Sequence, residues 1–389
     1  MPSSRPAAPG STASLRTANQ HRVLDVLRDG GEEHGAGRPA HTQAELARLT
    51  GLAPATVSNI VRELAASGLL DTVPGSGRRG SSVRLSETAG VVAGIDFGHA
   101  HVAVAVGDLS GRILAEERLP LAEPLGHEEA LGRAAAILDR LLEGRGPLRH
   151  AGLGLPAPVV NNVVRSSAIF PGWEEVDSSA QAAVVLGCPV DVENDANLGA
   201  LAEHRQGEGR GHHSLVYVKI ASGVGAGIVI NDRLFHGADG TAGEIGHLTI
   251  DEQGPMCRCG SRGCLETYTS AEHIARLVAP TLPSATLQEI VDAATSGTVS
   301  AQRALEDAGL HLGWALASVV NLLNPSVIIV GGRMATAGEL LLEPARTGLR
   351  RHALDSVAQT PVIESGLGAR ASLVGAVLLA AERTELVTA

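Results

Sequence analysis

The sequence has no apolar run of the roughly 18 to 20 residues that a membrane-spanning helix needs, which excludes a membrane protein. Its first twenty residues also lack the apolar core of a secretory signal peptide, and we interpret residues 1–18 as a polar, disordered tail. These absences predict a cytoplasmic protein without a membrane partner. The hydrophobic fraction of 44%, mostly Ala, Leu and Val, indicates a globular chain, and 389 residues allow two or three domains.

Cysteine is scarce, and its spacing does not suit a disulfide framework, because three of the four cysteines lie close together. Cys257, Cys259 and Cys264 offer three thiolates on a glycine-containing loop, and His247 upstream is the natural fourth ligand. Three thiolates and one imidazole form a closed tetrahedral set, which favours a structural over a catalytic zinc ion. The alternatives to zinc are redox-active cysteines or a coincidental cluster. Cys188 has no partner in the sequence, and we expect it to be a small buried apolar residue.

The chain as a whole lacks an excess of basic residues, and its formal net charge of −11 argues against nucleic acid as a partner. The charge is distributed unevenly, however. Residues 1–88 contain ten Arg and no Lys against eight Asp and Glu, or +2, so the other 21 basic and 34 acidic residues give −13. Opposite signs indicate two domains with different partners, and we expect the boundary near residues 86–90.

The pattern in residues 19–88 predicts three helices and a hairpin. The first helix is expected at about residues 20–28, a capping-box pattern at Thr42 begins the second, and Pro54 suits the first position of the third. The third helix has an apolar stripe that would face inward. Its opposite face is polar and consists of Thr56, Ser58, Asn59 and Arg62. The hairpin, at about residues 71–86, carries Arg78 and Arg79 at its tip.

This layout is typical of a winged helix-turn-helix, whose recognition helix enters the major groove and offers polar side chains to bases and phosphates. Arg78 and Arg79 would contact phosphates or the minor groove. The alternative is a small helical module that binds another protein, and the nearly neutral charge of the segment is a point in its favour. The combination of capped helix, short turn, polar face and basic wing favours DNA binding.

From residue 91 onward, strand-like runs alternate with short turns, and a similar order recurs from residue 214. This repetition suggests two duplicated lobes that face each other across a cleft. The glycines of the GVGAG stretch at 223–227 resemble a dinucleotide fingerprint, but a strand follows them instead of a helix. Such a hairpin could cradle a phosphate or could simply be a tight turn that needs positive φ, and the spacing does not decide between the two.

A carboxylate motif, ENDAN at 193–197, lies between a strand-like stretch and a helical one. A carboxylate at the N-terminus of a helix is well placed to accept a hydrogen bond or a proton from a hydroxyl group. The motif is weak in isolation, because Asp and Asn also cap helices that have no further function.

Taken together, these stretches resemble the ROK family of repressors, uncharacterised reading frames and sugar kinases, over about residues 19–385. The matching stretches are GIDFG at 94–98, GLGLPAPV at 152–159, PGW at 171–173, ENDAN at 193–197, SGVGAGI at 222–228, GEIGH at 243–247, CRCGSRGCLE at 257–266 and NPSVIIVGG at 324–332. The cysteine motif with its upstream GEIGH is the most specific of them.

The resemblance implies an α/β fold in which a winged helix-turn-helix precedes a two-lobed, actin/hexokinase-like (RNase H-like) domain. The implied lobes are residues 91–208 and 209–371, with a C-terminal helix at 372–386 returning to the first lobe. It further implies a zinc-stabilised loop and a sugar cleft bordered by Asn194, Asp195, Glu244, His247 and Glu266. His247 would then contact both the zinc ion and the sugar.

Departures from the kinase pattern bear on the function. ROK kinases usually carry Asp-x-Gly-Gly-Thr-Lys at the first phosphate motif, whereas here HAH at 99–101 follows the DFG stretch, so the hydroxyl and the lysine are missing. This loss should be costly, because phosphoryl transfer depends on positioning and charge neutralisation. Ile169 stands where kinases often have Asn, so the identity of the sugar stays open. A vestigial phosphate site would consist of Asp96, Gly98, Gly223 and Gly225.

The sequence therefore predicts a sugar-responsive transcriptional regulator, preferably a repressor of carbohydrate genes. Its partners would be operator DNA and a sugar or sugar phosphate, and it would act as a homodimer or homotetramer on the bacterial nucleoid. The alternative is an ATP-dependent hexose kinase that carries a DNA-binding head. In that case Asp195 would be the catalytic base, and ATP and Mg²⁺ would be cofactors.

Overall fold

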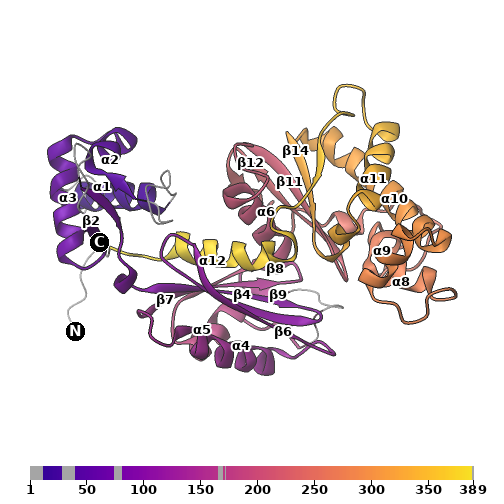
Figure 1. Cartoon of the computed structure of the whole chain (residues 1–389), viewed down its shortest axis with the longest axis horizontal. Helices are drawn as coiled ribbons and strands as arrows, with labels where there is room; N and C mark the ends of the chain where they lie inside the picture. Colours follow the sequence, from indigo (N-terminus) through magenta and orange to yellow (C-terminus); the bar gives the residue numbers. More distant parts are fainter. Residues whose placement is uncertain (1–11, 29–39, 74–80, 165–169, 171, 388–389) are drawn as a thin grey trace.

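The computed structural model describes residues 12–28, 40–73, 81–164, 170 and 172–387. In Figure 1 a small N-terminal head, a first lobe and a second lobe follow one another along the longest axis. Residues 1–11 of the predicted tail lie outside the described residues, as do Arg78, Arg79 and Ile169. No helix in the described part of the chain is long and apolar enough to cross a membrane.

The head (the described residues from 12 to 90) forms because local signals in its sequence agree. The predicted capping box is present: the Thr42 side chain accepts from the backbone of Glu45, and the Glu45 side chain accepts from the backbone of Thr42. Gly51, at φ 70°, ends that helix in the left-handed region. The elements are α1 (Thr12–Arg28), β1 (His41–Thr42), α2 (Gln43–Thr50), α3 (Pro54–Ala66), β2 (Leu70–Val73) and β3 (Ser82–Leu85).

One prediction for the head needs correction. Helix α1 begins at Thr12 instead of near residue 20, so residues 12–18 are helical and do not belong to a disordered tail. Their polar sequence gives no apolar periodicity to signal a helix. Farther along α1, Val23, Leu24 and Leu27 are buried in the core of the head.

The first lobe is built on a five-stranded sheet in the order β10-β7-β4-β5-β6. β4, β5 and β6 pair antiparallel, and β4, β7 and β10 pair parallel. Trp173 is fully buried in this core, with its ring 5.1 Å from that of Phe97 and 5.3 Å from that of Phe170. The elements are β4 (Val91–Gly98), β5 (His101–Gly107), β6 (Ile113–Pro120), α4 (His127–Leu142), β7 (Leu148–Leu155), β8 (Val159–Val160), β9 (Val163–Val164), α5 (Ser178–Leu186) and β10 (Val190–Asn194).

The second lobe repeats this arrangement, with a five-stranded sheet in the order β13-β12-β11-β14-β15. β11, β12 and β13 again pair antiparallel, and β11, β14 and β15 pair parallel. The predicted duplication of the lobes is therefore confirmed in strand order and direction. The elements are β11 (Ser214–Ile220), β12 (Val224–Ile230), β13 (Arg233–Leu234), α7 (Glu266–Thr269), α8 (Ala271–Val278), α9 (Leu287–Thr295), α10 (Val299–Leu323), β14 (Val327–Gly331), α11 (Glu339–His352) and β15 (Val362–Glu364).

Two helices, α6 (Asp195–Gln206) and α12 (Ala371–Arg383), connect the lobes. α12 packs against α6, β4 and β7, and α6 also packs against β11 and β12 of the second lobe. Glycine permits the closest contacts: a Cβ atom at Gly375 of α12 would lie 2.0 Å from the Leu198 carbonyl oxygen of α6. The two helices thus form the hinge region on which both sheets rest.

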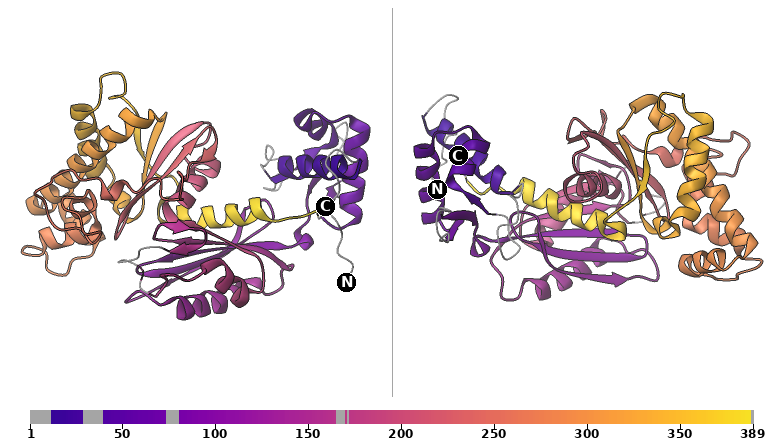
Figure 2. Two further views of the ribbon diagram at one scale, coloured as in Figure 1. Left: turned by 180° about the vertical axis from the view of Figure 1, so that it is seen from behind. Right: turned by 45° about the horizontal axis from the view of Figure 1, so that its top comes forward.

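The chain beyond α12 returns to the head. Both views in Figure 2 show α12 running from the region between the lobes toward the head, next to the C-terminus. The Arg28 side chain of α1 donates to the Thr384 carbonyl oxygen, and Leu386 and Val387 pack against the hydrophobic cluster that contains Leu24 and Leu27. The core of the head is therefore continuous with the C-terminal end of α12.

Candidate functional site

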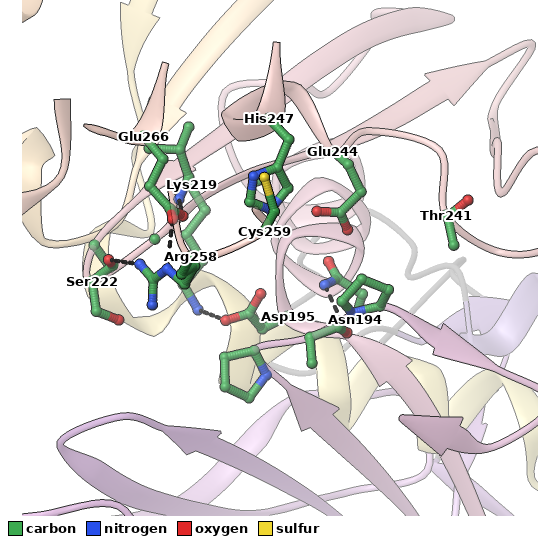
Figure 3. A pocket seen from close by; sticks show the side chains of 17 residues that line it. Asn194, Asp195, Lys219, Ser222, Thr241, Glu244, His247, Arg258, Cys259 and Glu266 are labelled. Carbon is green, nitrogen blue, oxygen red and sulfur yellow. Dashed lines mark hydrogen bonds and ion pairs between the residues drawn. The ribbon is translucent and has the colours of Figure 1, made fainter. Parts of the chain in front are cut away.

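A cavity of about 280 Å³, lined by both polar and apolar groups, lies between the lobes (Figure 3). The junction of β10 and α6, the end of β11, the 221–225 turn, the 241–247 segment and the cysteine loop all contribute to its wall. The five residues predicted to border a ligand line this one cavity, namely Asn194, Asp195, Glu244, His247 and Glu266. Residues separated by up to 72 positions in the sequence thus meet at one site.

The N-terminus of α6 presents Asn194 and Asp195. Asn194 is the N-cap: its side-chain oxygen accepts from the backbone of Ala196 and Asn197, and its amide nitrogen donates to the Ala157 carbonyl oxygen at 3.1 Å. Asn194 therefore has a clear structural task at this position. Asp195, the first residue of the helix, is nearly buried, and its Oδ2 accepts from the Lys219 Nζ at 2.7 Å.

Lys219, on β11, was missed by the sequence reasoning. Its ammonium donates to Asp195 and, at 2.8 Å, to the Ser372 Oγ, which in turn donates to the Asp195 carbonyl oxygen. Burial alone would lower the pKa of Lys219, but the charges of Asp195 and Asp96 outweigh this effect and raise it, so the ammonium stays charged. The sequence did contain a signal: the other 30 of the 31 basic residues are Arg, and Lys219 is the only lysine.

Glu266 and Glu244 bring two further carboxyl groups to the cavity. Glu266 is buried and fully engaged, because its Oε1 accepts from Arg258 at 2.7 Å and its Oε2 accepts from the Val224 backbone at 3.0 Å. Burial raises the pKa of Glu244 to about 7, with smaller contributions from the charges of Asp195 and Glu266. Glu244 can therefore both donate and accept hydrogen bonds near neutral pH. Glu266, in contrast, holds Arg258 and the backbone of Val224 in the cavity wall.

His247, Cys257, Cys259 and Cys264 form a compact cluster in which all the ligand atoms lie within 4.8 Å of one another. The Cys259 and Cys264 sulfurs are 3.7 Å apart, and the Cys257 sulfur is 3.6 Å from the His247 Nδ1. Tetrahedral zinc with Zn–S bonds of about 2.3 Å separates its sulfur ligands by about 3.8 Å, so the cluster fits a structural zinc site. A disulfide, at about 2.05 Å, does not match this spacing.

The cluster also reaches the cavity, because His247 and Cys259 contribute to its wall. Since Nδ1 of His247 faces Cys257, the Nε2 is left as the nitrogen that can meet a ligand. Cys188 lies apart from the cluster and is buried, and burial raises the pKa of its thiol to about 11. It is a neutral apolar residue, as expected.

A smaller cavity of about 70 Å³ lies beyond the Asp195–Lys219 pair, which lines both cavities. Asp96 and Gly98 line this second cavity, whereas Gly223 and Gly225 line the first, so the four residues of the expected phosphate site are divided between them. The Asp96 Oδ2 lies 2.8 Å from the His101 Nε2. Burial opposes ionisation of Asp96, but the nearby Lys219 and His101 hold its pKa far below the usual range.

The glycine hairpin between β11 and β12 does not need positive φ, which corrects one interpretation of its glycines. Among the described residues with positive φ, neither Gly225 nor Gly227 is present. Gly227 is needed for a different reason: a Cβ atom there would lie 2.4 Å from the Ala196 carbonyl oxygen. The glycine lets β12 pack directly against α6, which carries Asp195.

The predicted reading face of α3 is accessible. Val57, Ile60, Val61 and Leu64 are buried as predicted, whereas Asn59 and Arg62 are exposed and Thr56 and Ser58 are partly exposed. The polar face therefore points away from the core of the head, and nothing in the described part of the chain covers Asn59 or Arg62.

Comparison with known proteins gives two family matches. The model of the ROK family matches residues 92–383, and a model of the MarR family matches residues 16–79. The xylose repressor of Bacillus spizizenii is 27% identical over 86% of this chain and 89% of its own length. The glucokinase of Thermotoga maritima is 31% identical over 75% of this chain and 97% of its own length.

A solved structure matches almost the whole chain. A ROK family transcriptional regulator, described as a homologue of the MLC protein of E. coli, has 26% identity and a TM-score of 0.77. The match covers 94% of this chain and 96% of that one. The match therefore includes the head and both lobes of this chain.

Proposed function

Since this chain belongs to the ROK family and carries a MarR-type winged helix-turn-helix at its N-terminus, we propose that it is a sugar-responsive transcriptional regulator. The observation that carries the proposal is that one chain combines a helix whose polar face is accessible, α3, with a cavity between two lobes that several carboxylates line. The xylose repressors among its relatives favour repression of carbohydrate genes in the bacterial cytoplasm.

DNA would be bound by two heads of a homodimer or homotetramer, at half-sites related by two-fold symmetry. Helix α3 would enter the major groove N-terminus first and offer Thr56, Ser58, Asn59 and Arg62 to bases and phosphates. Arg78 and Arg79 of the wing would contact phosphates or the minor groove. The acidic body would keep the lobes away from the phosphates, so that the heads alone bind.

The ligand would be a monosaccharide in the cavity, held through its hydroxyl groups. Asp195 offers an acceptor oxygen, Glu244 can donate or accept, and His247 offers its Nε2. The relatives make D-xylose the first candidate, and a sugar phosphate remains in the panel of ligands to be tested.

Zinc would be held by His247, Cys257, Cys259 and Cys264. When bound, it would cross-link the loop that carries Arg258 and thus fix Glu266 in the cavity wall. Its contribution would be structural, because four protein ligands leave no open coordination position.

Coupling between cavity and head would pass through α12. Ser372, in its first turn, is hydrogen-bonded to Asp195, and the residues after its last turn contact α1. Sugar binding that changes the angle between the lobes would thereby move the head. The effect on operator affinity is limited to the difference in sugar affinity between the two arrangements.

The test measures binding of the full-length protein to labelled DNA from upstream of its own gene. Fluorescence anisotropy at several salt concentrations is the readout. D-Xylose, D-glucose, N-acetylglucosamine and their phosphates would be added in turn. We expect sequence-specific, salt-dependent binding that one sugar changes. If the head is a module that binds another protein, affinity for DNA will be absent at every salt concentration.

A hexose kinase is the second candidate, favoured by the glucokinase relatives and by the position of Asp195 in the cavity. ADP release in a coupled assay with glucose, fructose, N-acetylglucosamine and N-acetylmannosamine separates the two functions. Turnover that Asp195→Asn abolishes would establish the kinase. We expect no turnover, because the first phosphate motif lacks its hydroxyl and its lysine.

A further inference from the structure

The single lysine of the chain lies in a largely buried ion pair with Asp195. All 30 other basic residues, apart from histidine, are Arg, including those on the exposed faces of the head and lobes. Only 16% of the Lys219 side chain is exposed, and 12% of the Asp195 side chain beside it. A compact ammonium differs from a planar guanidinium in geometry, so the use of Lys here indicates a specific task.

We propose that Lys219 is a built-in counter-ion for Asp195 and Asp96, which lets the cavity bind a neutral sugar without nucleotide or divalent metal. The proposal rests on the sugar-binding function proposed above and assigns to Lys219 the positioning of Asp195. In phosphoryl-transfer sites, carboxylates and phosphates are neutralised by bound metal ions. Here the chain supplies the positive charge itself.

The hydrogen bonds of Lys219 fix Asp195 from one side. The ammonium holds the Asp195 Oδ2 at 2.7 Å and the Ser372 Oγ at 2.8 Å, so α6, β11 and α12 meet at this group. In Figure 3 the other carboxylate oxygen of Asp195 points away from Lys219 into the cavity. That oxygen is left to accept a hydrogen bond from a sugar hydroxyl, and the bond to Lys219 keeps it aimed there.

The buried carboxylates of Asp195 and Asp96 need a positive charge near them, and Lys219 provides it. Lys219 and Asp195 line both cavities, so the pair forms the partition between them. Behind the partition, Asp96 is 1% exposed, and its Oδ1 has no hydrogen-bond partner among the described residues. Two buried carboxylates without a cation would repel each other and would be strongly destabilised by desolvation. Lys219 supplies that positive charge, and the His101 Nε2 lies 2.8 Å from the Asp96 Oδ2.

The proposal is tested by calorimetric titration of the full-length protein with the sugar panel, first without added Mg²⁺ and nucleotide and then with both. The wild type should bind its sugar with the same Kd in both conditions. Lys219→Met should weaken binding by about tenfold or more, and added Mg²⁺ should restore part of the loss. Arg133→Met is the control, because Arg133 is exposed on α4, pairs with Glu129 and lines neither cavity, and its Kd should stay within about twofold.

The outcomes separate this proposal from the function on which it rests. Wild-type binding that appears only with Mg²⁺ and nucleotide, or an unchanged Kd in Lys219→Met, overturns the role of Lys219 and leaves sugar binding intact. A wild type that binds no sugar of the panel under either condition overturns the proposed function itself.

A second measurement uses the wild-type protein, so it does not require that a Lys219 variant folds. Because the chain has one lysine, ¹⁵Nζ/¹³Cε-lysine labelling gives a single side-chain NMR signal. We expect that signal to report a charged ammonium from about pH 6 to about pH 9 and to shift when sugar is added. A neutral amine in that range, or a signal that sugar leaves unmoved, would contradict the proposal.

Discussion

The cavity illustrates how individual side chains divide their work between structure and binding. Asn194 and Glu266 border it, yet most of their hydrogen-bonding capacity is spent on the protein: Asn194 caps α6, and Glu266 holds Arg258 and the 222–225 turn. Asp195, Glu244 and His247 retain polar atoms that face the cavity. Residues of the first kind shape the site, and residues of the second kind are the ones expected to touch a ligand.

The cysteine cluster yields a prediction for single residues. Metal analysis of the purified protein should find about one zinc ion per chain, because three sulfurs and one imidazole complete a tetrahedral set. Cys259→Ser should lose the ion and, with it, the sugar response, since the loop fixes Glu266. Cys188→Ser is the control and should keep the metal. Protein that contains no metal would refute the whole line of reasoning.

Arg62 of α3 can be used to test whether this helix contacts DNA bases. Arg62→Ala should weaken operator binding by about 1–3 kcal/mol if the side chain contacts a base, and should lower affinity for all sequences alike if it contacts phosphate. Anisotropy titrations with operator and scrambled DNA distinguish the two cases. Arg133→Ala is the control, because Arg133 is exposed on α4 of the first lobe and pairs with Glu129. An Arg62 variant with full operator affinity would remove α3 from the interface.

Among the elements, α12 packs against α6 and against β4 and β7 of the first lobe. Substitution of Gly375 tests how closely α12 and α6 pack. A Cβ atom at Gly375 would lie 2.0 Å from the Leu198 carbonyl oxygen, so Gly375→Ala must separate α12 from α6 and should cost about 1–3 kcal/mol. Gly132→Ala, within α4, is the matched control, because nothing lies within 4 Å of its Cβ position and helix propensity should favour Ala. Urea unfolding measures both. Equal stability of the two variants would contradict the close packing.

The elements also show what the sequence could and could not predict. The capping box at Thr42, the apolar stripe of α3 and the histidine–cysteine cluster were predictable, because each depends on residues near one another in the chain. The Lys219–Asp195–Ser372 contacts span 177 residues at their widest, and no local sequence pattern predicts them. The start of α1 at Thr12 was missed because residues 12–18 have no apolar periodicity, and Arg16 in this stretch pairs with the distant Glu63.

In the whole molecule, the two lobes contact each other outside α6 and α12 as well. His236, from the segment after β13, lies 2.7 Å from Glu193 at the end of β10. Nearby, Gly240 closely approaches the Val159 carbonyl oxygen of β8. These contacts join the 235–243 segment of the second lobe to the first lobe, so this structure represents an arrangement in which the lobes are in contact.

The His236–Glu193 pair should make lobe association depend on pH. The hydrogen bond to Glu193 raises the pKa of His236 above its ordinary 6.5, and burial opposes this only in part. Because the folded state binds the proton more tightly, the pair stabilises fully below about pH 6.5 and loses its effect as pH rises through the raised pKa. His236→Ala should therefore lower the melting temperature more at pH 6 than at pH 8.5.

Glu193→Gln removes the same ion pair from the other side and should reduce the pH dependence to a similar extent. Its absolute cost should be similar, because the amide oxygen of Gln can still accept the hydrogen bonds that Asn194 and Asn197 donate to the Glu193 Oε1. A melting-temperature difference between wild type and His236→Ala that is the same at both pH values would show that the pair is not formed.

The contact between α1 and Thr384 has a consequence for the order in which the protein is made. Domains generally begin to fold as they leave the ribosome, starting from the N-terminus. The head emerges first, yet Arg28 finds its partner 356 residues later, and Leu386 and Val387 join its core later still. A nascent chain that stops short of Thr384 therefore carries a head without these contacts, and we expect such a chain to bind DNA more weakly.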